Sequence, residues 1–156
     1  MDHKRRILLK SSLAASATGI AISAGLLTPK SVLAAWNSAA FDAKDVNAAL
    51  TGVFGSADVM DSDKIKLKAP DVAENGASVT ITVDSKLAKT ETISIIVSNN
   101  GTPLSATFNL GAKTEGFITT NIKMGKSSDV IAVVKADGKL YSTKQQVKVT
   151  IGGCGG

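Results

Sequence analysis

Residues 79–84 read Val79-Thr80-Ile81-Thr82-Val83-Asp84, with an apolar side chain at every second position. A period of two places the apolar side chains on one face of an extended strand and the polar ones on the other. The alternation recurs from Lys64 onward, and the continuous apolar run Val130–Val134 favours a strand covered on both faces. The other alternating runs are Ile65–Leu67, Ile93–Val97, Ala106–Leu110, Ile118–Met124 and Val147–Ile151.

Turn signals separate these runs. Asn75-Gly76 and Asn99-Asn100-Gly101 are typical of tight turns, and Asp137-Gly138 is typical of a two-residue hairpin turn. About seven short strands, each with an apolar face, predict an all-β fold of the immunoglobulin-like antiparallel β-sandwich type over residues 64–151. A small closed barrel is the alternative.

One stretch after the first 34 residues has helical periodicity. Apolar side chains recur at helical spacing over residues 37–55, where Ser38 is a candidate N-cap and Gly52 and Gly55 are candidate stop signals. We predict one N-terminal helix here. Together with a linker over Ser56–Asp63 it makes residues 35–63 a helix-and-linker segment.

Residues 1–34 have the layout of an export signal. The basic start Lys4-Arg5-Arg6 precedes the uncharged segment Ser11–Thr28, and Val32 and Ala34 are the small residues before a cleavage site. The basic start resembles a twin-arginine signal, with ordinary Sec export as the alternative. We expect a periplasmic protein, and no permanent membrane span, because the uncharged segment is mostly Ala, Ser, Thr and Gly.

Cleavage after Ala34 changes the composition. The net charge falls from +5 to +1, since 13 of 18 Lys+Arg and 12 of 13 Asp+Glu remain. The single His, His3, and every Arg are lost, so no imidazole is left for a general base or a metal, and no guanidinium for bases or phosphate. We therefore expect no catalytic residue, no metal, no cofactor and no nucleic-acid partner.

The chain ends in Gly152-Gly153-Cys154-Gly155-Gly156. Glycines leave the thiol sterically open and the backbone free, and three residues beyond Ile151 reach about 10 Å. We interpret residues 152–156 as a flexible swinging arm that presents Cys154 to a cleft of another protein. A lone Cys in an exported chain also fits an inter-subunit disulfide, and the protein would then be an exported β-sandwich binding module.

Two lysines, Lys144 and Lys148, lie close to this ending in the sequence. They can steer an acidic partner or screen a bound anion, but lysines on the exposed side of a strand usually form a solvated face. We favour the solvated face.

This ending, after Val147–Ile151, resembles that of the SoxY family, the sulfur-compound carriers of the bacterial thiosulfate-oxidising (Sox) system. The resemblance extends through Ile122–Gly125 and Val130–Tyr141, and to the leader. It implies a carrier rather than an enzyme, with Cys154 bearing sulfur intermediates such as an S-thiosulfonate and a persulfide. The implied partners are a SoxZ-type partner subunit, a SoxAX-type cytochrome that attaches thiosulfate, and a SoxB-type hydrolase that releases sulfate.

Overall fold

A computed structural model describes residues 37–150 of the chain. Within this range the chain forms two helices and nine strands. The helices are α2 (Ser38–Phe41) and α3 (Val46–Phe54). The strands are β1 (Met60–Asp61), β2 (Ile65–Lys68), β3 (Val72–Ala73), β4 (Val79–Ser85), β5 (Thr90–Val97), β6 (Leu104–Asn109), β7 (Phe117–Ile122), β8 (Ser128–Ala136) and β9 (Lys139–Val149).

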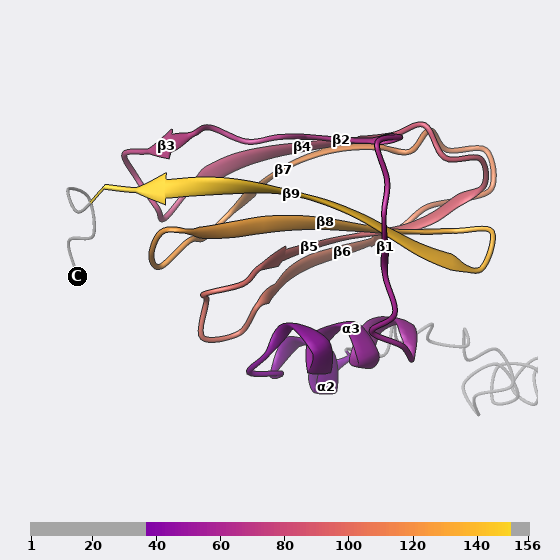
Figure 1. Cartoon of the computed structure of the whole chain (residues 1–156), viewed down its shortest axis with the longest axis horizontal. Helices are drawn as coiled ribbons and strands as arrows, with labels where there is room; N and C mark the ends of the chain where they lie inside the picture. Colours follow the sequence, from indigo (N-terminus) through magenta and orange to yellow (C-terminus); the bar gives the residue numbers. More distant parts are fainter. Residues whose placement is uncertain (1–36, 151–156) are drawn as a thin grey trace, which may run out of the picture. The chain divides into compact units, whose positions relative to one another are not determined.

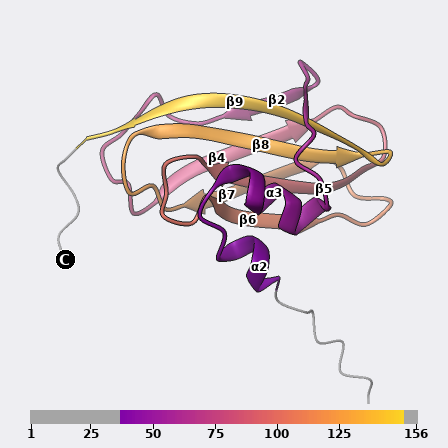
Figure 2. The same ribbon diagram turned by 60° about the horizontal axis from the view of Figure 1, so that its bottom comes forward.

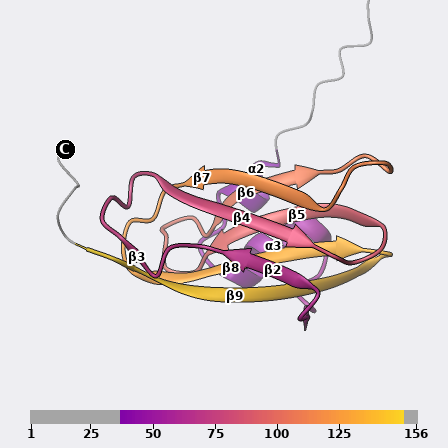
Figure 3. The ribbon, with the colours of Figure 1, turned by 90° about the horizontal axis from the view of Figure 1, so that it is seen from above.

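The strands form two sheets that pack face to face (Figures 1 and 3). The larger sheet has the order β1-β9-β8-β5-β6, with β3 also paired to β9, and the smaller sheet has the order β2-β4-β7. Strands β6 and β7 do not pair in the described chain, so the sheets stay separate. The predicted β-sandwich is confirmed, and the closed barrel is not formed.

The alternation in the sequence accounts for the core between the sheets. In β4, Val79, Ile81 and Val83 are at most 2% exposed, while Thr80 between them is exposed. Ile93, Ile95 and Val97 of β5 meet them from the opposite sheet, and Met124, which follows β7, belongs to the same core. Burying such a branched side chain contributes roughly 1.5–3 kcal/mol, so this core is a main source of stability.

Strand β8 is buried on both faces, as its continuous apolar run predicts. Val130, Ala132 and Val134 belong to the core between the sheets, whereas Val133 and the half-buried Ile131 belong to a second cluster on the outer face. The helices cover that outer face (Figure 2). The second cluster has as its buried members Ala40, Ala49, Leu50, Ile96, Leu104 and Val133.

Helical structure is present near the N-terminus as predicted, but the prediction of one continuous helix over residues 37–55 is wrong, because the chain forms α2 and α3 instead. Asn37, not Ser38, caps α2, and Asp45 caps α3 with its side chain on the amide of Ala48, 2.8 Å away. A capping aspartate has an extended backbone, so the helix cannot run through it. Gly55 ends α3 as predicted, with a left-handed φ of 76°.

The break folds α2 back onto α3. Gly52 lies inside α3 and does not end it, and its Cα faces α2: a Cβ placed there would lie 2.7 Å from the Ala40 Cα. The Asn37 Nδ2 donates to the Gly52 carbonyl at 2.6 Å. Gly52 therefore serves close packing between the helices. Phe41 and Phe54 pack against the second cluster.

Strands β1 and β3 were not predicted, and β1 lies inside the segment predicted as a linker. Each has two residues, too few to show a period, and each pairs with β9 in parallel. Strand β9 begins at Lys139, eight residues before the predicted run at Val147. The Asp137-Gly138 turn that joins it to β8 is confirmed, with positive φ angles of 48° and 74°.

Within residues 37–150, no helix combines the length and apolar character needed to cross a bilayer.

Replacing Gly52 by Ala tests the close helix contact. In an open helix this change stabilises by about 1 kcal/mol. Here the new methyl carbon would lie 2.8 Å from the Ala40 Cβ, so we expect the free energy of unfolding to fall by about 1–3 kcal/mol in chemical denaturation. Gly101→Ala, where a Cβ meets nothing within 4 Å, is the control. Equal stability of Gly52→Ala and the parent would contradict the contact.

Candidate functional site

The residues that the sequence singles out as the site, Cys154 with Gly152, Gly153, Gly155 and Gly156, lie outside the described residues. The structure describes the strand that leads to them. Strand β9 is described to Val149 and the chain to Thr150. We call Lys148–Thr150 the root of the arm.

Strand β3 on one side of β9 and the β7–β8 loop on the other side both hold the root. On one side, β3 pairs with it in parallel, Val72 opposite Lys148 and Ala73 opposite Val149. The Lys148 amide donates to the Asp71 carbonyl at 2.9 Å, and the Thr150 amide to the Ala73 carbonyl at 3.1 Å. Backbone bonds therefore fix β9 up to the last described residue.

On the other side, the loop between β7 and β8 holds the root. The Val149 amide donates to the Ser127 Oγ at 2.9 Å, where the ladder between β8 and β9 has already ended at Ser128 and Val147. The side chain of Val149 is half-buried and packs close to Gly76, where an added Cβ would lie 2.9 Å from the Val149 Cγ1 and would collide with the Met124 carbonyl oxygen. Gly76 therefore allows the β3–β4 loop, the β7–β8 loop and the root to pack together.

Sequence reasoning missed most of this anchorage. The pair Asn75-Gly76 predicts only a turn, and nothing in the sequence marks Ser127 or Ala73 as partners of β9. These contacts come from separate segments, and the two-residue strand β3 has no pattern of its own. The glycine of the turn is the one signal that could have pointed to a close approach.

The lysines predicted near the arm lie on exposed backbone positions of β9. Lys148, at the root, is opposite Val72 of β3. Lys144, four residues before Lys148, is opposite Ile131 of β8. Neither forms an ion pair within residues 37–150. This exposure is compatible with the predicted solvated face.

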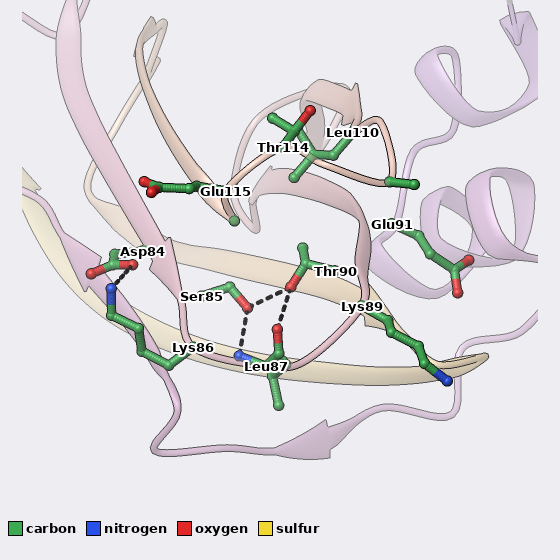
Figure 4. A pocket seen from close by; sticks show the side chains of 12 residues that line it. Asp84, Ser85, Lys86, Leu87, Lys89, Thr90, Glu91, Leu110, Thr114 and Glu115 are labelled. Carbon is green, nitrogen blue, oxygen red and sulfur yellow. Dashed lines mark hydrogen bonds and ion pairs between the residues drawn. The ribbon is translucent and has the colours of Figure 1, made fainter.

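A depression of about 720 Å³ lies at the opposite end of the sandwich from the root, and Figure 4 shows the side chains that line it. It is formed where β4 ends and β5 begins, beside Lys89, which binds Asp137 of the turn that starts β9. Strand β9 has 11 residues, so its two ends are roughly 33 Å apart. This depression is therefore remote from the root.

Several of its polar groups are paired with one another. The Ser85 and Thr90 hydroxyls are 3.0 Å apart, Thr90 donates to the Leu87 carbonyl, and the Leu87 amide donates to Ser85 (Figure 4). Lys89 lies 2.9 Å from Asp137, and this hydrogen bond holds the pKa of the Asp137 carboxyl below its usual value and raises the pKa of Lys89.

No group of three or more His, Cys, Asp or Glu side chains that could hold a metal ion occurs between residues 37 and 150.

Comparisons with known proteins agree with this fold. A solved structure of the sulfur carrier protein SoxY from Chlorobium limicola f thiosulfatophilum matches with a TM-score of 0.60 and 37% identity, covering 66% of this chain and 94% of that one. A superoxide reductase (neelaredoxin) from Ignicoccus hospitalis matches with a TM-score of 0.52 over 59% of this chain and 95% of that one; at 14% identity it shows the fold alone. Comparison with curated proteins finds no match.

The family comparison covers most of the chain and includes Cys154. The model for sulfur oxidation protein SoxY matches residues 50–154. That range contains α3 from Leu50 onward, all nine strands and the root. The chain therefore belongs to the SoxY family.

Proposed function

We propose that this protein carries intermediates of sulfur oxidation as covalent adducts on Cys154. The observation that carries the proposal is the family match, which continues through the root to Cys154. The solved relative from Chlorobium limicola is itself a sulfur carrier protein. Cys154 is the single Cys of the chain, so a thiol-bound adduct has one place to form.

The anchored root supports the use of residues 152–156 as a swinging arm. Backbone bonds hold the root as far as Thr150 on the β3 side, and the Ser127 hydroxyl holds the Val149 amide on the other side, so movement of the arm need not disturb the sandwich. Four glycines around Cys154 allow the backbone conformations that entry into a narrow active site requires. A fixed origin also sets how far the thiol reaches.

The chemistry needs an accessible sulfur that forms and breaks S–S bonds. In the first step, thiosulfate and the Cys154 thiol form a cysteine S-thiosulfonate, with loss of one proton and of two electrons to a SoxAX-type cytochrome. In the second, a SoxB-type hydrolase adds water, which releases sulfate and a proton and leaves a persulfide on Cys154. The protein supplies the attachment site, and its partners supply the catalysis.

Activation of the thiol fits this division of work. No Lys, Arg or His adjoins Cys154 in the sequence, so no neighbouring cation stabilises a thiolate. We infer that the active site of the partner enzyme supplies the groups that stabilise the Cys154 thiolate. A SoxZ-type subunit binds the sandwich, and export by the twin-arginine route, which accepts folded cargo, places the protein in the periplasm.

Replacing Cys154 by Ser tests the attachment site. We expect thiosulfate-dependent electron transfer to the cytochrome, in the system reconstituted from purified components, to fall to background, because the hydroxyl does not form the S–S bond. The circular dichroism spectrum and binding of the partner subunit should stay unchanged. Full electron transfer by the variant, with reduction changing only the oligomeric state, would instead favour the disulfide-linked binding module.

Replacing Ser127 by Ala tests the root. The Val149 amide loses its acceptor, and the loss of one hydrogen bond costs about 1 kcal/mol, so hydrogen exchange of the Val149 and Thr150 amides should speed up about fivefold. Ser127→Thr keeps the hydroxyl and should exchange at nearly the parent rate. Unchanged exchange in Ser127→Ala would mean that this hydroxyl does not hold the root.

A further inference from the structure

A second depression, about 630 Å³, lies at the root end of the sandwich. It opens where the edge strands β6 and β7 come together with the loop between the helices. Its wall includes Gly125, two residues before Ser127, which binds Val149 of the root. The polar residues that line it are Lys44, Asn100, Thr102, Ser105, Asn121 and Lys123.

The charge of this depression is one-sided. Lys44 and Lys123 line it, no Asp or Glu does, and neither lysine forms an ion pair within residues 37–150. Three other depressions on the described chain each include at least one carboxylate. Asp45, next to Lys44, turns its carboxylate to the amide of Ala48 in α3. Two uncompensated cations in one polar hollow favour an anion.

Ser105 provides a second, independent observation. Ile95 pairs with Ala106 and Ile96 with Leu104, so Ser105 is the extra residue of a β-bulge in β6. Its Oγ is buried and has no hydrogen-bond partner. A buried hydroxyl without a partner is costly, and bulges often redirect a side chain towards a site. The residue Ser105 lines this depression, and rotation of its side chain about χ1 would bring the hydroxyl to a ligand acceptor there.

The wall is built before any ligand arrives. The Asn100 Nδ2 donates to the Lys123 carbonyl at 2.8 Å, and its Oδ1 accepts from the Gly125 amide at 3.0 Å, which ties the β5–β6 turn to the β7–β8 loop. The Asn121 Oδ1 accepts from Thr80 at 2.8 Å, so its Nδ2 group can donate elsewhere. The available side-chain groups are therefore the ammonium groups of Lys44 and Lys123, one amide donor of Asn121, and the hydroxyls of Thr102 and Ser105.

We propose that this depression binds a small tetrahedral oxyanion of sulfur. The donor set fits several acceptor oxygens on one compact anion, and its mixed cations and neutral donors suit sulfate or thiosulfate better than an extended acid. The choice of sulfur rests on the proposed function; the anion site itself rests on the residues above. The oxyanion has two sources: the free ion, or the terminal sulfonate of an adduct on Cys154.

The free ion is tested with full-length Cys154→Ser protein, titrated with sodium sulfate and with sodium thiosulfate against sodium chloride of equal ionic strength. We expect saturable amide shifts in two-dimensional NMR at residues 100–105 and 121–125. The double variant Lys44→Gln/Lys123→Gln should weaken binding tenfold or more, the loss of a charge-assisted hydrogen bond, and Ser105→Ala should weaken it less. The double variant Lys113→Gln/Lys139→Gln, which replaces two exposed lysines that line none of these depressions, is the charge-matched control.

The second source is tested with the parent chain after reaction with tetrathionate. The Cys154 thiolate attacks an inner sulfur of tetrathionate, and thiosulfate leaves, so the protein carries an S-thiosulfonate. If the arm delivers the oxyanion, the same amides shift in the washed, loaded protein without added salt, and the double lysine variant abolishes the shift.

Two results would overturn the proposal. One is the lack of saturable shifts at these residues from either source. The other is binding that the control Lys113→Gln/Lys139→Gln weakens as much as Lys44→Gln/Lys123→Gln does, which would mean attraction to the overall charge. Because the titration uses protein without the Cys154 thiol, its outcome is separate from that of the carrier hypothesis.

Discussion

Strand β8 imposes a constraint on the rest of the molecule, because it is apolar on both faces. Val130, Ala132 and Val134 must be shielded from water on one face of the sheet, and Ile131 and Val133 on the other face. The three-stranded sheet supplies the first cover, and α2 and α3 supply the second (Figure 1). The close contact of Gly52 with Ala40 and the buried Leu50 both belong to this second cover. Strand β9, which leads to Cys154, pairs with β8 from Lys139 to Val147, so the packing of β8 also fixes where β9 lies.

The two ends of the sandwich differ in what they leave unsatisfied. At the end where β9 begins, Ser85, Thr90 and the ion pair of Lys89 with Asp137 are already engaged with one another. At the end where β9 leaves, the root is held, but Lys44, Lys123 and the hydroxyl of Ser105 have no partner within the described chain. Two lysines without an ion pair therefore lie together at the end from which the chain continues towards Cys154.

Most of the fold could be predicted from local periodicity, and the rest could not for physical reasons. The double burial of β8 was readable because its run Val130–Val134 has no polar interruption. The break at Asp45 could not be predicted, because the apolar spacing of residues 37–55 fits one continuous helix. The packing of α2 against α3 at Gly52 is a tertiary contact that this spacing does not report. Strand β3 is too short to have a period.

The site divides in the same way. Cys154 and its glycines stand out in the sequence as a local motif, and their role as an arm stays a prediction. The depression around Ser105 combines three distant segments with a β-bulge, and only the paired register reveals that bulge. A sequence pattern cannot report a contact that depends on how separate strands are placed side by side.

Intact-mass spectrometry of the protein purified from cells grown on thiosulfate tests the carrier hypothesis most directly. The hypothesis predicts a population that carries thiosulfonate, sulfonate or additional sulfur on the peptide ending in Gly156, removed by a thiol reductant. A uniformly unmodified thiol, or a dimer linked only through Cys154, would contradict it.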